Sequence, residues 1–182
     1  DTLRRVAHPV MHEDVTLAVG ICCDEIARQR LERDVAAVRR GLEERAVALD
    51  LGCAVGRSSF ELATFGVRVL GIDYSQSFVD AASQLVRDGS MPYERVDEGS
   101  ARTSLIARVP ENLRRDRVTF EQGDAMNLRA DLGDYDIVHA ANLFCRLTDP
   151  LKLIERLPSL VRTGGQLLLT TPCTWLEEFT PR

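Results

Sequence analysis

A glycine-rich segment flanked by an acidic residue carries the strongest chemical signal in the sequence. It reads Asp-Leu-Gly-Cys-Ala-Val-Gly-Arg-Ser from Asp50 to Ser58, between a short apolar run and a stretch of helical character. Glycines in such a turn let a ligand approach the backbone closely, beside the N-terminus of the next helix. The segment predicts a small-molecule binding loop, with a tightly packed strand-to-helix turn as the alternative.

A second acidic residue follows at the spacing expected of a nucleotide-binding fold. Asp73 ends the next apolar run, 17 residues after Gly56. A carboxylate placed about 20 residues beyond a glycine loop can accept hydrogen bonds from both ribose hydroxyls. Together, the loop and Asp73 predict a cofactor that contains adenosine.

The residues around the loop discriminate between adenosine cofactors. A dinucleotide-binding loop needs a small residue at position 57, and this chain has Arg57 there. Asp50 would repel a pyrophosphate, whereas it suits an ammonium or a sulfonium group. The pattern acidic-x-Gly-x-small-x-Gly instead resembles the first motif of class I methyltransferases that use S-adenosylmethionine.

Three later segments resemble the same class. Residues 120–126 resemble the segment that places an acid on the adenine amine, with apolar neighbours on the ring. Residues 135–142 resemble the fourth-strand motif, whose end lies near the methyl group, and residues 162–169 resemble the turn into the fifth strand. The resemblance implies the following cofactor-binding residues: Asp50, Gly52, Cys53, Ala54, Gly56, Arg57, Ser58, Asp73, Tyr74, Ser75, Asp124, Ala125, Met126, Ala141 and Asn142.

Longer stretches resemble a narrower family. Residues 48–63, 71–75 and 120–125, and above all Thr174–Thr180, are similar to the 4-mercaptohistidine (5-thiohistidine) N-methyltransferase domain of ovothiol-synthesis proteins. This resemblance implies S-adenosyl-L-methionine as methyl donor, S-adenosyl-L-homocysteine as product and an imidazole nitrogen as acceptor. The candidate substrate residues are Arg146, Cys145, Cys173 and Trp175.

The chain also departs from that family. Cys145 and Cys173 stand where the family leads us to expect Asp and Tyr, and Ser100 stands where we expect Glu. A methyltransferase for another small thiol or amine therefore remains an alternative, as does a non-catalytic adenosine-binding domain that serves a partner.

The sequence assigns no catalytic residue. His139, Tyr93 and Glu177 are conceivable bases, and for His139 a structural role in a buried strand is the favoured interpretation.

Alternating apolar runs and helical stretches position these motifs. Such an alternation predicts an α/β fold, a doubly wound Rossmann-like sheet with five recognisable parallel strands. The expected strands are 46–51, 67–73, 117–121, 135–141 and 166–170, and the expected helices are 58–65, 76–88, 151–161 and a short one near 105–109.

The resemblance to class I methyltransferases implies seven strands, the last two forming an antiparallel hairpin beside strand five. These two strands are missing from the sequence pattern, so we expect the edge of Gln166–Thr170 to be open or paired with another molecule. The chain is then expected to be a fragment, completed by a longer chain, a partner or a swapped protomer. Apolar spacing over 15–42 predicts helices, and we expect a helical segment 1–45 to pack on a cofactor domain 46–182.

Composition excludes several kinds of chemistry and of partner. The 182 residues carry a net charge of −5, which argues against nucleic acid as a partner, and Lys152 is the sole lysine. Lysine-based covalent catalysis would have to use that one residue. Three histidines predict no metal site, and five cysteines without C-x-x-C spacing predict reduced thiols in a cytoplasmic protein. No apolar run is long enough to cross a membrane, so no membrane partner is expected, and we expect a small-molecule substrate.

Overall fold

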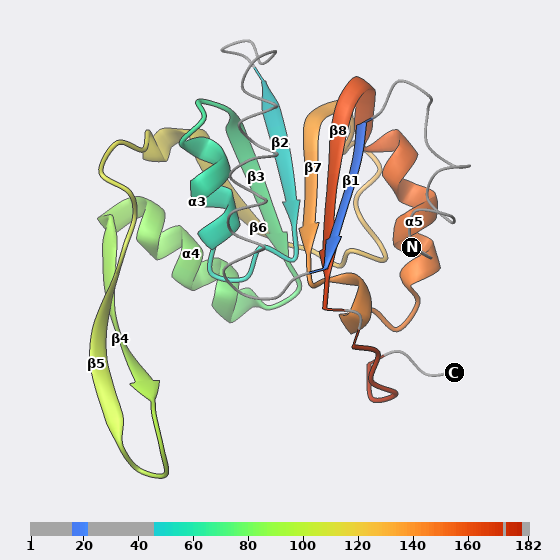
Figure 1. The fold of residues 1–182 in the computed structure, drawn as a ribbon. Helices are drawn as coiled ribbons and strands as arrows, with labels where there is room; N and C mark the ends of the chain where they lie inside the picture. The colour runs from blue at the N-terminus through green and yellow to red at the C-terminus, as the bar shows by residue number, and fades with distance from the viewer. Residues whose placement is uncertain (1–15, 22–45, 173, 180–182) are drawn as a thin grey trace.

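The core of the fold is one parallel sheet with helices on both faces (Figure 1). The structure is a computed structural model that describes residues 16–21, 46–172 and 174–179. Within them, six strands pair in the order β1-β8-β7-β2-β3-β6, all parallel. Their bounds are Thr16–Ile21 (β1), Val47–Leu51 (β2), Arg68–Asp73 (β3), Val118–Gln122 (β6), Tyr135–Ala141 (β7) and Val161–Thr171 (β8). The predicted α/β class and the five predicted parallel strands are confirmed.

Helices connect these strands close to where the sequence places them. Their bounds are Arg57–Ala63 (α3), Gln76–Asp88 (α4) and Pro150–Arg156 (α5), with 3-10 turns at Arg115–Arg117 (η1), Phe144–Arg146 (η2) and Leu157–Ser159 (η3). The α4 helix matches its prediction, and the Ser75 side chain accepts a hydrogen bond from the Phe78 N–H at its start. Helix α5 is shorter than expected because a 3-10 turn follows it and β8 already begins at Val161.

The apolar core lies in two layers, one on each face of the sheet. Side chains alternate between faces along a strand. Leu49 and Leu51 of β2 therefore pack with Leu153 and Leu157 on the α5 side. Ala48, which precedes Leu49, packs on the other side with the core of α3 and α4. Strands buried on both faces need apolar runs, and Val47–Leu49 of β2 and Leu167–Leu169 of β8 are such runs.

The sheet edge that we expected to be open is paired within the chain. β1 runs parallel to β8 along its whole length, from Thr16 against Gln166 to Ile21 against Thr171 (Figure 1). The expectation of an open edge or an intermolecular strand was therefore wrong. So was the helix predicted from residue 15 as far as it covers 16–21; the rest of 1–45 lies outside the described residues. β1 occupies the place where the family's antiparallel hairpin was expected, and it is parallel.

Residues 90–108 form an antiparallel hairpin, not the predicted short helix. β4 (Ser90–Val96) pairs with β5 (Arg102–Arg108), and this ribbon extends away from the main sheet (Figure 1). Its turn contains Gly99 with φ of 55°, and the Asp97 carboxylate accepts hydrogen bonds from Thr103 and Arg95. Those two donors, Thr103 first, lower the pKa of Asp97.

Among the described residues, no helix is both long and apolar enough to span a bilayer.

Replacing Gly71 should lower stability because the neighbouring ring occupies the space of a side chain. A Cβ on Gly71 would lie 2.5 Å from ring carbons of Phe120. We expect Gly71→Ala to reduce the free energy of unfolding by about 1–3 kcal/mol, as overpacking does. Urea unfolding followed by circular dichroism measures this, with Ser77→Ala on the exposed side of α4 as the control. Equal urea midpoints for the two variants would contradict the close packing of Gly71 against the Phe120 ring.

Candidate functional site

A cavity of about 750 Å³ opens at the carboxyl ends of the central strands. Loops that follow β2, β3, β6 and β7 form its walls, and the segment 174–179 adds one side chain. The lining residues are Gly52, Ile72, Asp73, Tyr74, Ser75, Phe78, Gly123, Asp124, Ala125, Met126, Ala141, Asn142, Leu143, Arg146, Leu147, Thr148 and Phe179. Carboxyl-end crevices are where open parallel sheets bind ligands.

The glycine loop needs its glycines for conformation and for space. Gly52 and Gly56 have φ of 69° and 87°, in the left-handed region that favours glycine. A Cβ on Gly56 would lie 2.5 Å from Phe120, so the loop closes tightly over that ring. At Gly52 the N–H donates to the Ile72 carbonyl at 2.8 Å, which ties the loop to β3 and leaves the glycine on the cavity wall.

Asp73 joins the glycine loop to the start of α4. Its Oδ2 accepts a hydrogen bond from the Ala54 N–H at 2.8 Å, and its Oδ1 accepts one from the Ser75 N–H at 2.9 Å. Each carboxylate oxygen can accept more than one hydrogen bond. Asp73 lines the cavity and is only partly buried, so its remaining lone pairs are available to hydroxyl groups of a ligand.

Asp124 occupies the equivalent place after β6. Its Oδ1 accepts a hydrogen bond from the Met126 N–H at 2.8 Å, which closes a local turn. Met126 in turn accepts hydrogen bonds at its sulfur from the Thr148 hydroxyl at 3.3 Å and the Asp149 N–H at 3.4 Å. The loop after β6 is thereby fastened to the loop after β7, and both line the cavity.

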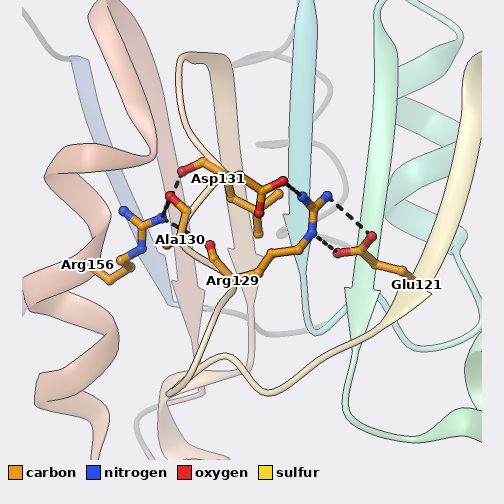
Figure 2. A network of polar contacts seen from close by, with 6 residues as sticks. Glu121, Arg129, Ala130, Asp131 and Arg156 are labelled. Carbon is orange, nitrogen blue, oxygen red and sulfur yellow. Dashed lines mark hydrogen bonds and ion pairs between the residues drawn. The ribbon is translucent and has the colours of Figure 1, made fainter.

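An arginine network on the outside holds the far part of the β6–β7 loop (Figure 2). Arg129 pairs with Glu121 of β6, with Nε 3.1 Å from Oε1, and also with Asp131. Arg156 of α5 reaches the same loop and donates to the carbonyls of residues 129, 130 and 132, the last at 2.8 Å. Both ends of the loop that carries Asp124 are therefore anchored.

Asp50 lies beneath the glycine loop, away from the cavity. It is 1% exposed, and its carboxylate accepts hydrogen bonds from Ser58 (2.8 Å) and Ser59 (2.5 Å) through Oδ2. Its Oδ1 lies 2.7 Å from Nδ1 of His139, which is 2% exposed. These three neighbours surround the carboxylate. Asp50 is not among the residues that line the cavity, and its contact with a cationic cofactor group stays a prediction.

The structure brings together nine of the fifteen residues expected to bind the cofactor. On the cavity wall are Gly52, Asp73, Tyr74, Ser75, Asp124, Ala125, Met126, Ala141 and Asn142. The other six belong to the segment 50–58 but do not line the cavity: Asp50, Cys53, Ala54, Gly56, Arg57 and Ser58. Cys53 is buried, and burial together with Asp50 and Asp73 raises the pKa of its thiol, so it is held as a neutral thiol. Arg57 is exposed and pairs with Glu61 at 2.8 Å.

Of the candidate substrate residues, Arg146 lines the cavity and the others do not. Cys145 is 1% exposed, with its sulfur 3.5 Å from the Asn142 carbonyl, and Trp175 is 48% exposed on the surface. Cys173 lies outside the described residues. The conceivable bases also lie off the cavity wall: His139 is buried against Asp50, Tyr93 is on the hairpin, and Glu177 is exposed.

Sequence reasoning missed seven residues of the cavity wall, most of them apolar. They are Ile72, Phe78, Gly123, Leu143, Leu147, Thr148 and Phe179. All lie at or soon after expected strand ends or belong to the segment similar to the narrower family, which was the available signal for them. The described residues hold no group of three His, Cys, Asp or Glu side chains placed to share a metal ion.

Comparison with known proteins assigns the family. Residues 23–180 match a methyltransferase domain family, which is most of the chain and includes every loop of the cavity. This chain belongs to that family. The match begins inside the segment 1–45 that we expected to be separate, and the division into two segments stays a prediction.

Individual relatives are distant and longer. A ubiquinone biosynthesis O-methyltransferase of Coxiella burnetii is 24% identical over 123 residues, 68% of this chain and 42% of that protein. This methyltransferase domain thus spans less than half of the length of that relative.

Two solved structures share its fold. Phosphoethanolamine N-methyltransferase 2 of Haemonchus contortus, in complex with S-adenosyl-L-methionine, has a TM-score of 0.55 at 21% identity, over 76% of this chain and 27% of that one. The glycopeptide N-methyltransferase MtfA, complexed with sinefungin, has a TM-score of 0.54 at 22% identity, over 76% and 51%.

Removing the Asp73 carboxylate should weaken binding of S-adenosylhomocysteine. Asp73→Ala deletes an acceptor for ligand hydroxyls and frees the Ala54 and Ser75 N–H groups, so we expect a loss of roughly 1.5–3 kcal/mol in binding free energy. Isothermal titration calorimetry measures it. Asp80→Ala, on the exposed side of α4, is the matched control, and an Asp73 variant with the affinity of that control would rule out the assignment.

Replacing Asp124 should weaken cofactor binding, whereas replacing Asp131 should leave it unchanged. Asp124→Asn keeps an oxygen for the Met126 N–H but places an NH2 group where an adenine amine would donate. We expect Asp124→Asn and Asp124→Ala both to weaken S-adenosylhomocysteine, and Asp131→Ala on the exposed side of the same loop to leave it unchanged. If Asp124→Asn binds as wild type does, Asp124 serves only the turn.

Proposed function

We propose that this protein transfers the methyl group of S-adenosyl-L-methionine to an imidazole nitrogen of 5-thiohistidine. The observation that carries the proposal is the cavity itself. It places Asp73 and Asp124 at consecutive strand ends of the sheet, beside a glycine loop, in a chain of the methyltransferase domain family. Relatives of the same fold were crystallised with S-adenosyl-L-methionine or sinefungin.

The described residues fit this cofactor. Asp73 offers acceptor lone pairs to two ribose hydroxyls, and a carboxylate there disfavours a phosphate on the ribose. Asp124 offers an acceptor to the adenine amine, and Ala125 and Met126 provide apolar contacts for the ring. Gly52 has no side chain that would fill the wall near Leu143, so the cofactor tail has room beside the loop.

When bound, the cofactor would supply a methyl carbon attached to a cationic sulfur. An imidazole nitrogen would take up this methyl group with its lone pair, the electrons of the broken S–C bond would stay on sulfur, and the ring N–H proton would pass to water. The protein aligns donor and acceptor and excludes bulk water, which accelerates such a displacement without a strong base. Asn142, with φ of 56°, and Leu143 follow β7 on the cavity wall, where the resemblance to class I methyltransferases puts the methyl group.

The choice of acceptor rests on the resemblance to thiohistidine N-methyltransferases. The segment with the most specific similarity, 174–179, contributes Phe179 to the cavity wall. Of the departures from that family, Cys145 is buried away from the cavity, so this exchange leaves the wall itself unchanged. A hydroxyl acceptor is the second candidate, because the Coxiella relative is an O-methyltransferase.

A turnover screen tests the proposed function. We expect the purified protein to release S-adenosylhomocysteine on addition of 5-thiohistidine, with N-methylated product seen by mass spectrometry, and to give none with catechol-type hydroxyl acceptors. Turnover of histidine and of ergothioneine-like thioimidazoles in the same assay shows whether the acceptor must carry the sulfur. Turnover of hydroxyl acceptors alone would support the second candidate. Cofactor binding without turnover of any acceptor would favour a non-catalytic adenosine-binding domain.

A further inference from the structure

The charged side chains of the cavity are distributed unevenly. Asp73 and Asp124 follow β3 and β6, whereas Arg146 follows β7, on the opposite side of β2 in the strand order. Among the described residues that line the cavity, Arg146 is the only basic one. The adenosine end of the cavity is therefore acidic, and the end beyond the methyl position carries a guanidinium.

The local turn fixes the direction of Arg146. In η2 the Arg146 N–H donates to the Leu143 carbonyl at 2.8 Å. Phe144 and Cys145, which precede it, are 0% and 1% exposed. With these two side chains in the core, the turn carries the next residue to the outside, where Arg146 lies on the cavity wall.

The flat face of the Arg146 guanidinium stacks on an aromatic ring, which leaves the N–H groups at its edge available for hydrogen bonds. Its carbon lies 4.5 Å from the centroid of the Phe179 ring, in a cation–π contact. Stacking uses the plane of the group and leaves its N–H donors free for a carboxylate. Among the described residues no carboxylate pairs with Arg146, whereas Arg57, Arg114 and Arg162 each pair with one.

We propose that Arg146 binds the carboxylate of the methyl acceptor through a bidentate pair and that Phe179 positions it, so the acceptor is a small molecule with a free carboxylate. This inference rests on the proposed function and narrows its substrate class to compounds of the amino-acid type. A planar guanidinium matches a carboxylate through two parallel hydrogen bonds, which a lysine ammonium cannot reproduce.

Calorimetry on the complex with S-adenosylhomocysteine tests the proposal without turnover. We expect Arg146→Gln to weaken 5-thiohistidine by about 10- to 100-fold, the loss of a charge-assisted pair, and to leave S-adenosylhomocysteine affinity unchanged. Arg146→Lys and Phe179→Leu should give smaller losses. Arg68→Gln is the matched control, because Arg68 is exposed at the opposite end of β3. Equal 5-thiohistidine affinity in wild type and Arg146→Gln would overturn the proposal.

Decarboxylated acceptors separate this inference from the proposed function. The wild type should bind 5-thiohistidine more tightly than the corresponding thiohistamine, and Arg146→Gln should bind both alike. If the wild type binds no thiohistidine, the proposed acceptor is wrong, and the comparison moves to histidine, tyrosine and tryptophan against their amines. A preference for acids that disappears in Arg146→Gln would then still support the carboxylate site. No such preference in the wild type would overturn it.

Discussion

A buried carboxylate beneath the glycine loop is the constraint on which the site depends. Asp50 is removed from water, and an ionised group in that position is costly unless its lone pairs are satisfied. Asp50 itself belongs to β2, and its partners come from two other elements: Ser58 and Ser59 of α3 and His139 of β7. Because an ionised carboxylate only accepts, His139 donates from Nδ1. Strand, neighbouring strand and helix are thereby fixed around the loop that they support.

The walls of the cavity are irregular backbone that is held from outside. Ala54 and Asn142 have positive φ, which costs energy for residues with a side chain, and both stand where a loop leaves a strand of the site. The Asp73 carboxylate bonds the Ala54 N–H, and the carbonyl of Thr170 in β8 accepts from the Asn142 N–H at 2.8 Å. Rigid strands thus impose the strained turns that border the cavity.

The sequence predicted the elements that are marked by local residue patterns and missed those that depend on long-range pairing or on weak patterns. β2, β3 and β7 are short, mainly apolar runs, and Ser75 and Gly89 mark both ends of α4. β1 is an apolar run of six residues whose spacing also fits a helix, and only its long-range pairing with β8 decides between them. The hairpin β4–β5 is largely exposed, so the alternation that identifies half-buried strands is weak there.

The same limit explains which site residues were found. Asp73 and Asp124 stand at strand ends, where sequence order alone predicts their neighbourhood, and the fold places them on one cavity. Asp50 also ends an apolar run, but the pattern could not show that two hydroxyls and an imidazole would enclose it. A carboxylate enclosed by neighbouring donors stabilises the structure around a site. A carboxylate that keeps free lone pairs can accept hydrogen bonds from a ligand. The distinction depends on three-dimensional partners: Asp50 is enclosed by donors, whereas Asp73 and Asp124 lie on the cavity wall.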